Sequence, residues 1–180
     1  MSTSKAIKAA YTLLEKHKIK SAPVPIQKIA KLEKLNVIPY DFSTNVSGAL
    51  IVENDIATIG VNPFENTKRK RFTIAHEMGH FILHSNRSNS LFVDNTTFLN
   101  SELHFRNEVS SQGEDKKEIE ANAFAAALLM PKFLVEKELK IISKSSKSYN
   151  DELIVKQLAK KFVVSVVAMT FRLANLGIRG

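Results

Sequence analysis

His76-Glu77-Met78-Gly79-His80, an HExxH pattern, closes the apolar run that begins at Phe72. Residues four apart on a helix share one face, so His76 and His80 can bind one metal ion together. Glu77 lies about 100° further round the helix, where its carboxylate can reach a water on that metal without being a ligand. The pattern predicts a zinc-dependent hydrolase, most often a peptidase; the alternative is a helix that carries two histidines by chance.

A second helix is predicted to supply a third ligand, since catalytic zinc usually takes three protein ligands and water. Residues 118–130 are rich in helix formers, and Pro131 ends the run. Glu118 and Asn122 share a face, so Glu118 can bind the metal while Asn122 orients a ligand histidine. Glu120 points elsewhere and ranks second. Alone, this run would indicate a core helix with solvated glutamates at its start; the HExxH pattern upstream favours the ligand interpretation.

These two stretches together resemble one known family. Residues 71–84 (RFTIAHEMGHFILH) and 118–131 (ExEANxFAAxLLMP) are similar to the ImmA/IrrE metallopeptidases. The likeness extends to Pro23-Val24-Pro25-Ile26 and to the C-terminal pair of predicted helices, so it covers most of the chain. The resemblance implies a zincin-like metallopeptidase fold. It also implies one Zn²⁺ per chain, bound by His76, His80 and Glu118, and a catalytic Glu77.

The resemblance also implies a substrate. Members of that family are associated with site-specific cleavage of helix-turn-helix repressors, often encoded nearby in mobile elements or stress-response circuits. We therefore expect a zinc metalloendopeptidase that cuts a specific repressor protein and relieves repression of transcription. An alternative is a pseudo-enzyme that binds such a regulator without cutting it, although the complete HExxH pattern and Glu118 argue against that.

Composition sets the class of protein. A chain of 180 residues suits one domain with a sizeable core. It has no cysteine, which excludes thiolate ligands and a cysteine nucleophile and fits a reducing compartment. The N-terminal residues are polar and lead into no apolar segment typical of a secretory signal. The longest apolar stretches fall short of the ~20 residues that a bilayer requires. We expect a soluble, cytoplasmic protein that does not contact the membrane.

The formal net charge of +8 raises the question of an acidic partner. Lysines are spread along the chain, and the one compact basic block is Lys68-Arg69-Lys70-Arg71, just before the HExxH pattern. This block could steer an acidic protein substrate towards the site. A solvated helix end is an equally good interpretation.

The predicted fold is α+β and mainly helical, with a small antiparallel sheet and a C-terminal helical subdomain. Apolar spacing predicts helices at 5–18 and 25–34. Strands are expected at 37–42, 49–52 and 56–61, the last two forming a hairpin. The connection 85–115 holds two further candidate strands, 91–93 and 103–105. We expect a metallopeptidase domain at 1–142, a linker at 143–150, and a helix pair at 151–180 that packs on the first domain or is linked to it.

Two other histidines and one arginine are further candidates for the site. His84 lies about 12 Å from His76 along a continuous helix, too far to share one tetrahedral ion, so a structural or supporting role is expected. His104 and Arg106 could stabilise the oxyanion of a tetrahedral intermediate, but a surface role is the better expectation.

The C-terminal helix pair has the spacing of a helix-turn-helix, so the main rival function is a DNA-binding regulator. A helix that recognises bases needs polar or basic side chains, and residues 166–174 offer Arg172 and little else. Val163 also occupies the position at which such turns usually have glycine. We therefore expect this helix to pack against protein, and specific nucleic-acid binding is the minor alternative.

Overall fold

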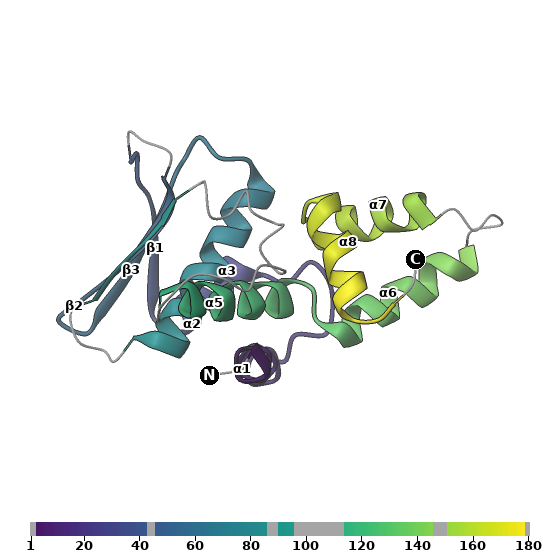
Figure 1. The fold of residues 1–180 in the computed structure, drawn as a ribbon, viewed down its shortest axis with the longest axis horizontal. Coiled ribbons are helices and arrows are strands. Elements are labelled where there is room, and N and C mark those ends of the chain that lie inside the picture. Colours follow the sequence, from purple (N-terminus) through teal and green to yellow (C-terminus); the bar gives the residue numbers. More distant parts are fainter. Residues whose placement is uncertain (1–2, 43–45, 86–89, 96–113, 146–150, 179–180) are drawn as a thin grey trace.

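The computed structural model describes residues 3–42, 46–85, 90–95, 114–145 and 151–178. Within these residues the chain forms seven helices and four strands (Figure 1), in the following order: α1 (Thr3–Lys16), α2 (Ile26–Leu32), β1 (Leu35–Pro39), β2 (Val46–Glu53), β3 (Ile56–Val61), α3 (Thr67–His84), β4 (Ser90–Asn95), α5 (Glu114–Leu129), α6 (Lys132–Ser145), α7 (Asp151–Phe162) and α8 (Val166–Asn175). The prediction of a mainly helical α+β fold is confirmed.

The four strands form one mixed sheet in the order β1-β3-β2-β4. The predicted hairpin is present: β2 and β3 are antiparallel, and the turn residues Asn54 and Asp55 have φ of 50° and 63°. A two-residue turn in which both residues have positive φ has a backbone twist that matches the twist of the two strands it joins. β4 is antiparallel to β2, whereas β1 is parallel to β3. The predicted small antiparallel sheet is therefore present in β2, β3 and β4, and β1 departs from it as a parallel strand beside β3.

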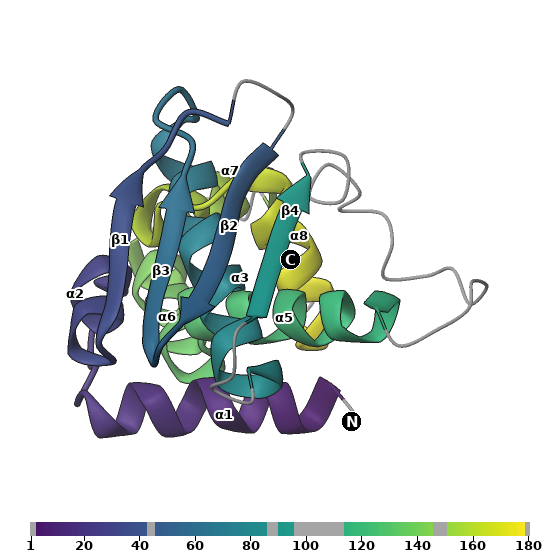
Figure 2. The same ribbon diagram turned by 90° about the vertical axis from the view of Figure 1, so that its left-hand side faces the viewer.

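Helices cover one face of this sheet, and the other face is turned outwards (Figure 2). The inner face of β3 carries the buried side chains Ala57, Ile59 and Val61. α3 lies directly against β2: a Cβ on Gly48 would come within 2.2 Å of Thr73 Cγ2. Only glycine therefore fits at position 48, and this close contact places the HExxH helix between the sheet and the remaining helices.

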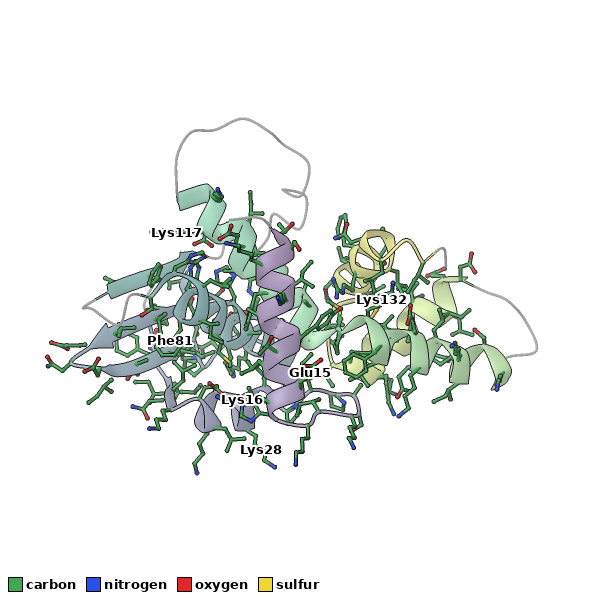
Figure 3. The ribbon with its side chains drawn as sticks, turned by 90° about the horizontal axis from the view of Figure 1, so that it is seen from below. Glu15, Lys16, Lys28, Phe81, Lys117 and Lys132 are labelled. Atoms are coloured by element: carbon green, nitrogen blue, oxygen red, sulfur yellow. The ribbon has the colours of Figure 1, made fainter. Side chains whose placement is uncertain are left out.

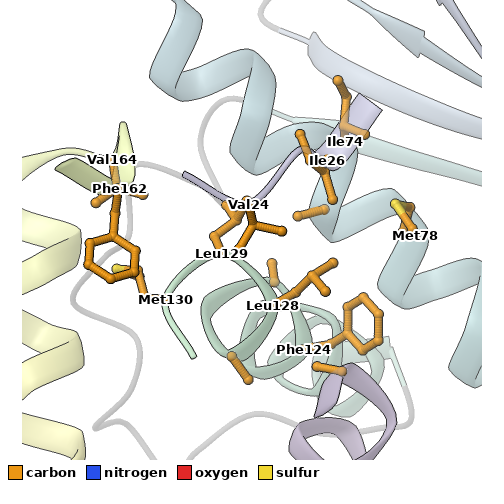
Figure 4. Packing of buried hydrophobic residues seen from close by; sticks show 14 of the residues in the cluster. Val24, Ile26, Ile74, Met78, Phe124, Leu128, Leu129, Met130, Phe162 and Val164 are labelled. Atoms are coloured by element: carbon orange, nitrogen blue, oxygen red, sulfur yellow. The ribbon is translucent and has the colours of Figure 1, made fainter. Parts of the chain in front are cut away.

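The core is built around α3 and α5 (Figure 4). Ile74 and Met78 of α3 and Phe124 and Leu128 of α5 are almost completely buried. The same core continues to the C-terminal helices through three further buried residues: Met130, Phe162 and Val164. Apolar burial of this kind contributes about 25 cal/mol per Å². One continuous apolar cluster therefore holds α3 and α5 together with the C-terminal helices.

The C-terminal pair α7 and α8 is joined by a tight turn. Ser165 caps α8 by accepting a hydrogen bond from the Ala168 backbone N–H at 3.0 Å. Val163 has φ of 56°, the left-handed conformation that usually requires glycine. Valine at this position therefore does not prevent the turn between α7 and α8.

Other predicted features fall partly outside the described residues. The candidate strand at 91–93 is the centre of β4, but 103–105, His104 and Arg106 lie outside the described part of the chain. The predicted linker starts inside α6, which continues to Ser145, and its remainder, 146–150, is also outside. Among the described residues, no helix has both the length and the apolar composition needed to cross a membrane.

Candidate metal centre

α3 carries the HExxH residues into the interior of the protein. The helix begins at Asn66, whose side chain accepts a hydrogen bond from the Arg69 backbone N–H at 3.0 Å. Residues 73–80 are buried without interruption, which means that this part of the helix is enclosed on every side. His76 and Glu77 are 0% exposed and His80 is 2% exposed. The two imidazoles are thus held in a rigid, water-poor environment.

Three side chains from two helices converge at one point. His76 Nε2 lies 2.9 Å from His80 Nε2, and the Glu118 carboxylate of α5 approaches both, with Oε2 3.1 Å from His76 Nε2 and Oε1 3.0 Å from His80 Nε2. These residues form a group that could hold a metal ion. A triangle with these sides is the size that three ligands about 2 Å from a single ion would form.

Asn122 determines which nitrogen of His76 faces the other two groups. His76 Nδ1 lies 2.9 Å from Asn122 Oδ1 and donates to it, so Nε2 presents a lone pair towards Glu118 and His80. A carboxylate also offers only lone pairs. A cation between these acceptors would remove their mutual repulsion, so the donor set fits a metal ion.

The ionisation of the group also fits this interpretation. Burial lowers the pKa of His80, which outweighs the opposing effect of its hydrogen bond with Glu118 and keeps the imidazole neutral and able to bind metal. For Glu118, burial acts to raise the pKa, but the interactions of its carboxylate with the imidazoles of His76 and His80 outweigh burial and hold the pKa well below its usual range. Glu118 is therefore an ionised carboxylate.

Glu77 and Glu120 lie apart from this triangle. Glu77 is fully buried on α3, next in sequence to His76, although its two oxygens are not within the group of three. Glu120 is 4% exposed, and its Oε2 lies 3.7 Å from His84 Nε2. The structure thus brings Glu118, and not Glu120, to the two histidines, and it places His84 beside Glu120.

The basic block before the motif is largely engaged in structural contacts. Arg69 donates to Ser47 Oγ through Nε and a terminal nitrogen, both at 3.2 Å. Lys70 Nζ donates to the Pro63 carbonyl at 2.6 Å. Arg71 donates to the Val24 carbonyl at 2.9 Å. These bonds connect α3 to β2 and to the segment before α2, so the block contributes to folding more directly than to steering of a substrate.

Sequence reasoning missed one neighbour of the group. Phe92 of β4 stacks on the His80 ring, with centroids 4.8 Å apart and planes at 21°. The sequence marked 91–93 as a candidate strand, but strand alternation gives no information on which buried side chain will meet a histidine of another element.

A mainly helical α+β fold with a His-His-Glu group on two adjacent helices is typical of metallopeptidases. The chain belongs to the peptidase family M78, the IrrE N-terminal-like domain, whose model matches residues 30–174.

Two relatives and one solved structure are similar to this chain. The uncharacterized immunity region protein 2 of Bacillus phage phi105 is 31% identical over 129 residues, 72% of this chain and 71% of the relative. Metallopeptidase ImmA of Bacillus subtilis (strain 168) is 28% identical over 171 residues, 90% of this chain and 85% of the relative. A Mycobacterium tuberculosis transcriptional regulator has the same fold over 95% of this chain, with a TM-score of 0.59 and 14% identity; the chain spans 46% of that protein.

Proposed function

We propose that this protein is a zinc-dependent endopeptidase that cuts one peptide bond in a specific protein. The observation that carries the proposal is the triangle of His76, His80 and Glu118, with Glu77 buried beside it on α3. In this proposal the three residues of the triangle bind one Zn²⁺ per chain and Asn122 orients His76. Zinc bound there would polarise the scissile carbonyl and make attack by water possible at neutral pH.

Glu77 acts as the general base in this scheme. It takes the proton from the attacking water and then delivers it to the leaving amine, so that one carboxylate serves both steps. His76, His80 and Glu118 do not change protonation during the reaction.

For the substrate, we propose a helix-turn-helix transcriptional repressor. Two similar proteins support this choice by their names: a phage immunity region protein and the metallopeptidase ImmA. We propose that the protein acts in the cytoplasm, as part of a mobile element or of a stress-response circuit. We further propose that residues 1–142 form the peptidase domain and residues 151–180 a helical subdomain.

The test first asks whether a reading frame beside this gene encodes a helix-turn-helix repressor, and then uses that repressor as substrate. Purified protein with one equivalent of zinc should convert the repressor into two fragments, identified by mass spectrometry. Glu77→Gln should keep its zinc and its fold yet cut at least about 100-fold more slowly, within the range of general-base contributions. Glu136→Gln, an exposed change on α6, is the matched control.

Two results would contradict the proposal. Cleavage by Glu77→Gln near the wild-type rate would remove Glu77 from the role of base, and loss of zinc from this variant would make it a ligand. A wild-type protein that holds zinc and cuts other proteins, but leaves the repressor intact, would refute the proposed substrate alone.

A further inference from the structure

The two histidines of the proposed zinc site are held in different ways. His76 is oriented by a hydrogen bond between its Nδ1 and Asn122 Oδ1. His80 Nδ1 is buried and has no hydrogen-bond partner among the residues that the structure describes. A histidine that binds a metal usually donates its other ring N–H to a carboxylate, carbonyl or water, and this bond fixes the plane of the ring. Among the described residues, the contact that can restrain the plane of His80 is one between rings.

Phe92 provides that contact. Its ring lies nearly parallel to the imidazole of His80, with centroids 4.8 Å apart and planes at 21°. When two flat rings are stacked, neither ring can tilt far from the parallel arrangement without losing contact with the other. Because the Nε2 atom of His80 lies in its ring plane, a restraint on that plane is also a restraint on where its lone pair points.

The sheet holds Phe92 in place. Phe92 pairs with Leu50 across β2 and β4, and Leu50 is fully buried. Its neighbour Leu91 points to the opposite face and is 66% exposed, as the alternation of a strand requires. The Phe92 side chain is therefore turned towards the helices by backbone pairing.

Phe92 also contacts the helix that carries the third proposed ligand. Lys117 Nζ lies 5.9 Å from the centroid of the Phe92 ring, and Lys117 directly precedes Glu118 on α5 (Figure 3). One aromatic ring thus lies between a side chain of α3 and a side chain of α5, beside the point where the two helices bring their ligands together. An ammonium group over an aromatic face is attracted to it.

We infer that Phe92 is a positioning residue, which holds the His80 imidazole in the plane that metal binding requires. The inference rests on the proposed zinc site. It assigns to an aromatic stack the task that Asn122 performs for His76 by a hydrogen bond. Phe92 is not a ligand and has no part in proton transfer.

Metal affinity tests this directly. Phe92→Leu should weaken zinc binding about tenfold, the lower end of what loss of a residue supporting a ligand costs. The dissociation constant is measured by competition with a chromophoric chelator. Phe92→Tyr keeps the flat ring and should restore affinity to near that of the wild type. Leu91→Ala, on the same strand but the outer face, is the matched control and should have no effect.

The visible spectrum of the Co²⁺-substituted protein gives a second measurement. Phe92→Leu should shift or weaken its ligand-field bands, since one histidine is no longer held in a fixed plane, while Phe92→Tyr should match the wild type. If Phe92→Leu does not fold, as judged by circular dichroism without metal, Phe92→Met keeps the volume, removes the ring and takes its place.

The outcomes separate this inference from the proposed function. Wild-type affinity and an unchanged Co²⁺ spectrum in Phe92→Leu, with zinc bound normally by the wild type, would overturn the role of Phe92 and leave the zinc site intact. An equal loss in Phe92→Tyr would also overturn it, because the ring would then not be what matters. A wild-type protein unable to bind zinc would instead refute the proposed site itself.

Discussion

Gly79 of α3 lies against the backbone of Ala121 of α5. A Cβ at position 79 would come within 3.0 Å of Ala121 Cα, 3.2 Å of Ala121 O and 3.2 Å of Phe124 Cδ1. The two helices are therefore as close as their backbones allow. Gly79 directly precedes His80, and Ala121 directly precedes Asn122 and follows Glu118 by less than one turn. This close approach is what brings the carboxylate of one helix to the imidazoles of the other.

Gly79→Ala should therefore impair the metal site more than the fold. The new methyl group meets backbone atoms that cannot rotate away, so α5 has to shift, at a cost of about 1–3 kcal/mol. The higher helix propensity of alanine compared with glycine offsets about 1 kcal/mol of this cost in the free energy of unfolding. We expect a small loss in the free energy of unfolding but a roughly tenfold weaker affinity for zinc, from chelator competition.

Ile82→Ala is the control for that variant, because Ile82 is 36% exposed on the same helix. It should leave zinc affinity unchanged. Zinc binding by Gly79→Ala as tight as in the wild type would show that the distance between α3 and α5 does not set the geometry of the site.

A second prediction concerns the choice between Glu118 and Glu120. Glu118 lies 3.1 Å from His76 Nε2 and 3.0 Å from His80 Nε2, whereas Glu120 Oε2 lies 3.7 Å from His84 Nε2. Glu118→Gln should lower the zinc content of the purified protein well below one per chain, and Glu120→Gln should keep it near one. Elemental analysis of dialysed samples gives the answer. The reverse pattern would make Glu120 the ligand.

Much of this site could be predicted from sequence because helix periodicity is a local property. Residues four apart share a face in any helix, so His76 with His80, and Glu118 with Asn122, could be paired before the structure was known. The stacking of Phe92 on His80 could not, since it depends on which strand lies at the edge of the sheet. Nor does a sequence show that β1 runs parallel to β3, because strand order depends on contacts between distant residues.

The strand boundaries show the same division. The structure places β3 at Ile56–Val61, as predicted, because a turn with two left-handed residues fixes where the hairpin begins. By contrast β1 is Leu35–Pro39 rather than 37–42. Among the described strands it pairs with β3 alone, so its register depends on that distant strand. Features determined by near neighbours in the chain were predicted well, and those determined by tertiary pairing were not.

The third prediction concerns pH. Burial lowers the pKa of His80 below its usual 6.5, so the unfolded chain takes up a proton there more readily than the folded, metal-free protein. The free energy of unfolding of the metal-free protein should therefore fall as the pH drops below about 6.5. Zinc affinity should stay nearly constant from pH 8 to about 6.5 and decline in more acid solution, where protons compete for the ligands.

Chemical denaturation and chelator competition across this pH range measure both effects. His80→Gln without metal is the control, because it has no imidazole at this position and should lose the part of the pH dependence that belongs to His80. A zinc affinity that already declines between pH 8 and 7 would show that His80 is not kept neutral by burial.

The final prediction concerns Arg172 and the rival function of DNA recognition. Arg172 is the single basic side chain of α8, and it is 6% exposed. Its Nε donates to the Met130 carbonyl at 2.9 Å, and one of its terminal nitrogens lies 3.5 Å from the Tyr11 hydroxyl. The guanidinium therefore ties α8 to the end of α5 and to α1. A side chain used in this way is not available to contact bases.

Arg172→Ala should accordingly destabilise the protein without a specific effect on DNA. Loss of buried hydrogen bonds to a charged group costs about 1–3 kcal/mol in the free energy of unfolding. Lys160→Ala is the matched control, since it removes one exposed positive charge from α7. In gel-shift titrations with promoter and scrambled DNA, both variants should show the same weak binding, which falls steeply with salt. If the protein instead binds one sequence tightly at physiological salt, and Arg172→Ala alone abolishes that preference while remaining folded, then α8 recognises DNA and its contact with Met130 is not its main role.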